Sequence, residues 1–136
     1  MNWKLIFQLS LFGLAMALAT VYVVPSKLEP VLWLPIFVIC AALIARHAPG
    51  RPFLHGLALG VVNSLWITAA HVLLFETYVA HHGGEAAMMK NLPVGVSPRL
   101  LMACVGPIIG VVSGAVIGLF ALIAARIVKR TPVPGS

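Results

Sequence analysis

The chain has 136 residues, of which 61% are hydrophobic and only 9% are charged. A soluble domain of this length has too little core volume to bury so much apolar surface, so the composition excludes a soluble globular protein and predicts an all-α integral membrane protein. The net charge of +6 does not indicate nucleic-acid binding. The Lys and Arg residues stand at the ends of apolar runs, where they determine membrane topology, instead of clustering on one polar face.

The first apolar run, residues 5–24, is long enough to cross the hydrocarbon core of a bilayer and ends before Pro25. Lys4, the apolar run and the sequence Ala-Leu-Ala at residues 17–19 also fit a secretory signal peptide with its cleavage site. Because the run continues beyond that site to full membrane length, we expect an uncleaved first span. A cleaved signal peptide is the alternative.

The second run, residues 31–46, is short for a span, because its apolar part measures about 22 Å at about 1.5 Å per residue. We therefore expect Arg46 to extend its side chain to the lipid headgroups. Cys40 in this run and Cys104 in the last run are far apart in sequence and form no CxxC motif. Both are predicted to be small buried residues rather than a redox pair.

The third run, residues 53–79, holds most of the polar residues at membrane depth, above all His55, Asn63 and His71. Such residues are costly in lipid and face the helix bundle, so we expect hydrogen bonds between helices. A polar lining for a small solute or a proton path is the alternative. His55 and His71 are 16 residues apart, which is about 24 Å along a helix. They cannot bind one metal ion or one haem, and no cofactor is predicted.

The segment after the third run combines histidine, glutamate and methionine. Gly83 and Gly84 are predicted to break the helix, and a short amphipathic helix on the outer surface should follow. Histidine and methionine suit copper, whereas histidine and glutamate suit zinc. The candidate metal ligands are His81, His82, Glu85, Met88 and Met89. Their spacing matches no established metal motif, so the polar end of a membrane helix is the preferred interpretation.

The fourth run, residues 100–128, carries a glycine at every fourth position, a pattern typical of a glycine zipper. The third run has a series of small residues with the same spacing. The two series are Gly106, Gly110, Gly114 and Gly118 in the fourth run, and Gly56, Gly60, Ser64 and Thr68 in the third. Lipid offers no hydrophobic drive for helix pairing, so close backbone contact between small residues has to supply the attraction. We expect these two faces to pack together.

The basic residues also predict an orientation. Six of the nine Lys and Arg residues lie at the N-terminus, in the middle loop and at the C-terminus, so these segments are predicted to be cytoplasmic. Residues 1–136 then form one transmembrane domain with both termini in the cytoplasm, most simply in a bacterial inner membrane. The segment rich in histidine and methionine would face the periplasm.

Known catalytic motifs are absent from the sequence. It contains no Ser–His–Asp set, no HExxH, no paired carboxylates and no phosphate-binding glycine loop, so we do not expect an enzyme. The glycine series favour a structural, accessory or regulatory role through helix contacts. The expected partners are the lipid bilayer and either a second copy of the chain or another membrane protein. The alternative is an oligomeric transporter of a small solute, a proton or a metal ion.

Overall fold

The structure is a computed structural model and describes residues 1–25, 27–48 and 50–127. These residues form six α-helices and no β-strand: α1 (Trp3–Tyr22), α2 (Glu29–His47), α3 (Pro52–Leu73), α4 (Phe75–His81), α5 (Gly83–Lys90) and α6 (Pro98–Ile127). Within the described residues, four helices are long and apolar enough to cross a membrane, namely α1, α2, α3 and α6. The predicted all-α chain with four such helices is confirmed. The predicted end of the fourth span, residue 128, lies outside the described residues.

Local sequence explains where the long helices begin. At the start of α1, the Asn2 side chain accepts a hydrogen bond from the Leu5 N–H at 3.1 Å, as a helix N-cap does. The other three long helices carry Pro30, Pro52 and Pro98 in their first turn. Proline is tolerated there because the first N–H groups of a helix have no partner within the helix. In α2 this places the start at Glu29, two residues before the predicted start of the second span.

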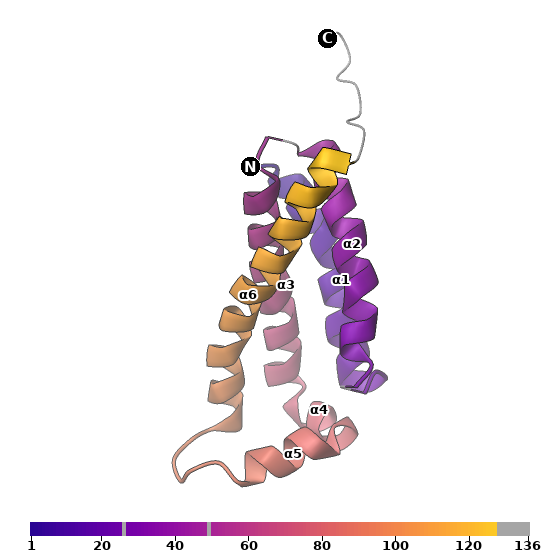
Figure 1. The fold of residues 1–136 in the computed structure, drawn as a ribbon. Helices are drawn as coiled ribbons and strands as arrows, with labels where there is room; N and C mark the ends of the chain where they lie inside the picture. The colour runs from indigo at the N-terminus through magenta and orange to yellow at the C-terminus, as the bar shows by residue number, and fades with distance from the viewer. Residues whose placement is uncertain (26, 49, 128–136) are drawn as a thin grey trace.

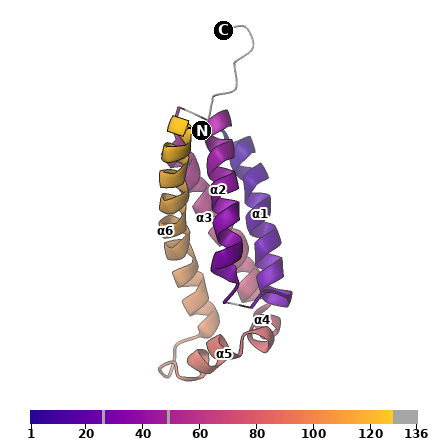
Figure 2. The same cartoon turned by 45° about the vertical axis from the view of Figure 1, so that its right-hand side comes forward.

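The four long helices lie side by side and alternate in direction, and α4 and α5 cover one end of the bundle (Figures 1 and 2). We call the end where α1 begins and α6 finishes the closed end, and the end with α4 and α5 the open end. The main core cluster lies toward the closed end and consists of Leu5, Ile6, Leu9, Cys40, Ala41, Ile44, Ala48, Leu59, Ile117 and Ala121. The apolar packing is therefore densest in the half of the bundle near the N-terminus.

The most extensive helix contact joins α3 and α6 through small residues. A Cβ atom built on Gly60 would overlap the backbone of Gly114, and one on Gly56 would lie 2.5 Å from Gly118 Cα. The antiparallel pairs along this contact are Gly56 with Gly118, Gly60 with Gly114, Ser64 with Gly110, and Thr68 with Gly106. All eight residues of the two small-residue series therefore meet within one chain.

Polar contacts join α1 to α3 at three heights. The Asn2 N–H donates to His55 Nε2 at 2.9 Å near the closed end, and Trp66 Nε1–H donates to Ser10 Oγ at 3.2 Å in the middle. Toward the open end, Thr20 Oγ1 and His71 Nε2 lie 3.1 Å apart. These contacts align two parallel helices that have no glycine series between them.

The third predicted span needed correction. Residues 53–79 are not one helix, because α3 ends at Leu73 and α4 starts at Phe75, with Leu74 between them at φ −107° and ψ 34°. The second break also differs from the prediction. It falls at His82, with φ −129° and ψ 72°, and Gly83 and Gly84 are the first residues of α5. The physical reason is tertiary, because the buried His82 ring lies against two backbone carbonyls, Tyr78 O at 2.8 Å and Val24 O at 3.2 Å.

The two cysteines differ in their surroundings. Cys40 is buried as predicted, whereas the same prediction was wrong for Cys104, which is exposed. Cys104 lies two residues before Gly106 on α6, which is about 200° around the helix. Since Gly106 faces α3, Cys104 faces away from the bundle.

Candidate ligand cavity

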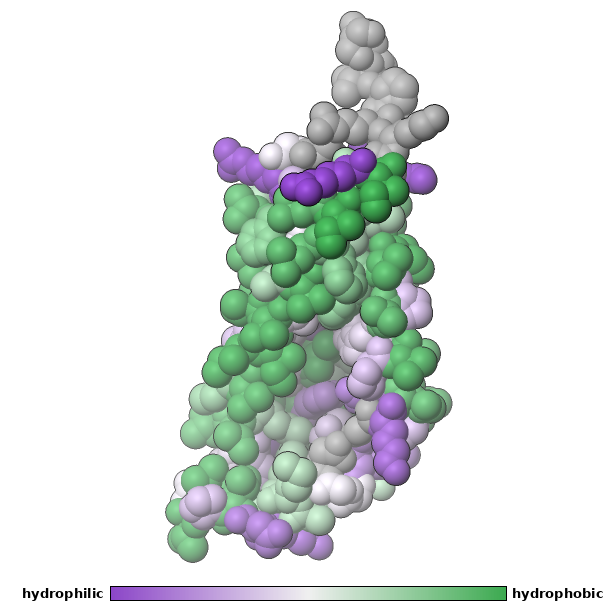
Figure 3. All heavy atoms as spheres, viewed as in Figure 1, coloured by the Kyte–Doolittle hydropathy of each residue, from purple (hydrophilic) through white to green (hydrophobic). Residues whose placement is uncertain are grey.

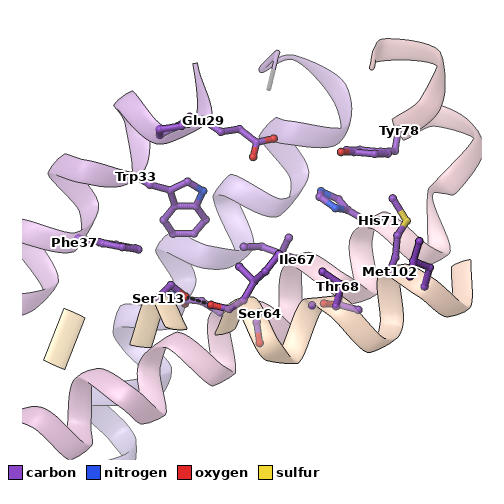
Figure 4. A pocket seen from close by; sticks show the side chains of 16 residues that line it. Glu29, Trp33, Phe37, Ser64, Ile67, Thr68, His71, Tyr78, Met102 and Ser113 are labelled. Atoms are coloured by element: carbon purple, nitrogen blue, oxygen red, sulfur yellow. Dashed lines mark hydrogen bonds between the residues drawn. The ribbon is translucent and has the colours of Figure 1, made fainter. Parts of the chain in front are cut away.

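The open end of the bundle contains a cavity of about 570 Å³ between α2, α3 and α6, closed on one side by Tyr78 of α4. The surface along the helices is mostly hydrophobic, but hydrophilic residues gather in a hollow in the half near α4 and α5 (Figure 3). The residues that line the cavity lie at similar heights on the three long helices (Figure 4). Polar groups in a hollow among apolar helices are unusual, because burying a polar group costs free energy unless it has a hydrogen-bond partner.

One wall of the cavity is a stripe on α2. Glu29, Trp33 and Phe37 follow one another at four-residue intervals, which places them on one face of the helix. All three side chains project from α2 toward α3 and α6 (Figure 4). The ring centroids of Trp33 and Phe37 are 5.7 Å apart, with the planes tilted by 53°. This wall therefore presents a carboxylate next to two aromatic rings.

The facing wall comes from α3 and α6 and contains hydroxyl groups that already donate their protons to backbone carbonyls. Ser64 Oγ–H donates to Val61 O at 2.7 Å, and Ser113 Oγ–H donates to Ile109 O at 2.8 Å. A hydroxyl has one proton and two lone pairs. Ser64 and Ser113 therefore offer the cavity acceptors rather than donors.

His71 stands at the open end of the cavity in a column of stacked rings. The centroids of His71 and Tyr78 are 4.2 Å apart, and those of Tyr78 and His82 are also 4.2 Å apart. Thr20 Oγ1–H donates to Ala17 O at 3.1 Å, so His71 Nε2–H must donate to Thr20 Oγ1. In the neutral ring this leaves His71 Nδ1 as an acceptor.

Asn63 lies at the closed side of the cavity and is buried, with 4% of its surface exposed. Its Oδ1 atom has no hydrogen-bond partner among the described residues. The carboxamide packs against Gly13 of α1, where a Cβ atom would lie 2.7 Å from Asn63 Cγ. An unpaired buried amide oxygen costs about 1–3 kcal/mol. The Asn63 oxygen faces Gly13, so this cost arises at the contact between α1 and α3 rather than inside the cavity.

His55, the other intramembrane histidine singled out from the sequence, is far from this cavity. Its Nδ1–H donates to Arg51 O at 2.7 Å, and its Nε2 accepts from the Asn2 N–H at 2.9 Å. One neutral tautomer satisfies both contacts. This histidine therefore links the starts of α1 and α3.

The five candidate metal ligands lie on α4 and α5 and at the break between them. His81 is exposed, and its Nδ1 lies 2.9 Å from Thr77 O, whereas the His82 ring is buried between two carbonyls. Met88 is 71% exposed on α5, and Met89 is half-buried. Glu85 belongs to α5, but its side chain is not among those described. Across the described residues, no group of three or more His, Cys, Asp or Glu side chains is arranged to hold a metal ion.

Sequence reasoning missed the stripe on α2. The predicted second span began at residue 31, which left Glu29 outside the span. The signal was present in the four-residue spacing of Glu29, Trp33 and Phe37. This spacing can be recognised as one face of a helix only when the helix is known to start at Glu29.

No protein-family model, no curated protein and no solved structure matches this chain. What the protein does therefore has to follow from the chemistry of its own residues, and the cavity at the open end is where that chemistry is concentrated.

Proposed function

We propose that this chain is a multi-pass membrane protein that binds a small molecule with polar and apolar parts in the cavity between α2, α3 and α6, as a carrier or receptor for that molecule. One observation carries the proposal, namely a cavity of about 570 Å³ whose mostly apolar lining also contains a carboxylate, hydroxyl groups and an imidazole. This volume falls within the range of about 300–1,000 Å³ typical of small-molecule sites. The cavity lies within a single chain, so binding needs no oligomer.

The polar residues of the lining support a ligand rather than only helix packing. Ser64 and Ser113 line the cavity and bond only to carbonyls of their own helices, so their oxygen lone pairs have no partner on another helix. A residue retained for interhelical packing would be expected to bond across the helix contact. The unused hydrogen-bonding capacity favours a partner that enters the cavity.

The glycine series give less support to a role through contacts with another protein. Their small faces are occupied by the contact between α3 and α6 of the same chain. An accessory or regulatory role would then have to use other surfaces. We retain it as the weaker candidate, since no described surface specifically favours it.

The proposed setting is a bacterial inner membrane with both termini in the cytoplasm. The support is the excess of Lys and Arg at the two termini and in the middle loop. In this orientation the open end lies on the periplasmic side, and the cavity takes up its ligand from that side or from the outer leaflet.

The test is ligand binding by the detergent-purified chain with a matched pair of variants. Ile109 lines the cavity, whereas its neighbour Ile108, which is exposed to a similar extent, does not line it. A panel of small amphiphiles is screened by thermal shift and native mass spectrometry against the native chain, Ile109→Trp and Ile108→Trp. We expect ligands that stabilise the native chain and Ile108→Trp but not Ile109→Trp, because the larger ring fills the cavity. Equal binding by both variants would place the ligand elsewhere and refute the proposal.

A further inference from the structure

We propose that the ligand is an organic cation, an ammonium or guanidinium group that donates N–H bonds and is attached to an apolar body. This inference rests on the proposed function and identifies the chemical class of the molecule in the same cavity. It follows from the charge, the rings and the hydrogen-bonding groups of the lining, which are three independent properties.

The charge of the lining is opposite to that of the chain. The chain carries a net charge of +6, yet among the described residues that line the cavity Glu29 is the one acid, and no Lys or Arg is present. Glu29 also has a contact within the chain, but an ionised carboxylate has about four lone-pair sites and accepts from several donors. In a partly dehydrated cavity its attraction for a cation is several-fold stronger than in water. An anion would meet repulsion from Glu29, and the described residues of the lining include no Lys or Arg.

The rings beside Glu29 suit the same ligand. Trp33 and Phe37 follow it on one face of α2, and Tyr78 and His71 stand across the mouth of the cavity (Figure 4). An aromatic face attracts a cation within about 6 Å of the ring centroid, and tryptophan does so most strongly. The cation would lie between the carboxylate and the indole ring. The apolar body would then extend along Ile67, Val105 and Ile109.

Three side chains of the lining, Ser64, Ser113 and His71, offer acceptors to the cavity. The hydroxyl protons of Ser64 and Ser113 are donated to backbone carbonyls, which leaves oxygen lone pairs for the cavity. His71 donates through Nε2 to Thr20, which leaves Nδ1 as an acceptor in the neutral ring. Such a lining complements a ligand with several N–H donors.

The experiment compares three probes that share one apolar body: phenethylamine, which is a cation, phenethyl alcohol, which is neutral, and hydrocinnamate, which is an anion. Binding to the purified chain is measured by calorimetry and by Trp fluorescence. We expect phenethylamine to bind most tightly and Glu29→Gln to weaken it roughly tenfold or more. The same variant should leave binding of the alcohol nearly unchanged.

The matched control is Glu76→Gln, which removes a carboxylate at the same end of the molecule but outside the cavity. Glu76 is exposed and lies 3.7 Å from Arg99. It should leave phenethylamine binding unchanged, and an equal loss in both variants would mean general charge attraction and overturn the inference. A second variant, Trp33→Leu, should also weaken the binding of phenethylamine more than the binding of the alcohol.

The outcomes separate this inference from the proposed function. If the alcohol or the anion binds more tightly than phenethylamine, the inference of a cationic ligand is wrong. If Ile109→Trp then abolishes that binding, the cavity is still supported as the binding site. If none of the three probes binds, the inference of a cationic ligand is also wrong. The amphiphile screen then tests the proposed function separately.

Discussion

At the scale of single residues, the buried polar groups of this bundle fall into two kinds. His55 and Thr20 use their hydrogen-bonding atoms within the chain. Asn63 is also buried, but its carboxamide oxygen has no partner among the described residues. Groups of the first kind stabilise the fold, whereas a group of the second kind destabilises it unless something else binds there.

Asn63→Leu is therefore expected to raise thermal stability and to abolish ligand binding. The leucine has a similar volume and removes an unpaired amide oxygen, which is worth about 1–3 kcal/mol. Thr20→Val is the contrasting variant, because it removes a hydroxyl with two bonds and should lower stability by about 1 kcal/mol. Unfolding temperatures in detergent measure both effects. If Asn63→Leu were clearly less stable than the native chain, the Asn63 carboxamide would stabilise the contact with Gly13 of α1.

At the scale of elements, α3 and α6 are the pair on which the rest of the bundle depends. Their backbones meet at Gly56 with Gly118 and at Gly60 with Gly114. Toward the open end the residues between them become larger, with Ser64 and Thr68 facing Gly110 and Gly106. The cavity lies beside this part of the pair. The close contact near the closed end and the cavity near the open end thus belong to one helix pair.

The glycine contact gives the second prediction. Gly60→Ala should destabilise the protein by about 1–3 kcal/mol, because the added Cβ meets the Gly114 backbone, which cannot rotate away as a side chain can. Gly83→Ala is the matched control, since a Cβ there meets no atom within 4 Å. Alanine also has a better helix propensity than glycine, so this control should be neutral or slightly more stable. Equal unfolding temperatures for the two variants would show that α3 and α6 tolerate separation.

At the scale of the whole molecule, the bundle has a packed end and an open end, and its outer surface suits lipid. Many large apolar side chains face outward on the long helices, among them Leu11, Val31, Leu65 and Val112, each more than half exposed. This exposed apolar surface is expected for helices surrounded by acyl chains and costly in water. The start of α1 and the end of α6 lie at the same end of the bundle (Figure 1).

The orientation of the whole molecule gives a further prediction. Alkaline phosphatase fused after Ser136 should show no periplasmic activity, and the same enzyme inserted at Gly84 should be active, because six of the nine basic residues lie on the side of the termini. The reverse pattern would place the cavity on the cytoplasmic side. Activity at both positions would indicate that the first span is removed as a signal peptide.

Much of this architecture was determined by the sequence alone. Length and hydropathy determined the number of apolar helices and their approximate bounds, because these properties depend on residues close together in the chain. The four-residue glycine spacing was equally plain. The spacing of the glycines did not distinguish a partner helix in the same chain from one in another chain. The structure brings Gly60 and Gly114 together within one chain.

Only the tertiary structure decided where the site lies. Tyr78 stacks between His71 and His82 across the break at Leu74, and the structure places these three rings at the end of a cavity formed by other helices. The early start of α2 makes Glu29 the first residue of a stripe, and that stripe lines a cavity only because α2, α3 and α6 leave space between them toward the open end. A cavity is a space between segments far apart in the chain, so its position depends on how whole helices pack and not on the local pattern of any one of them.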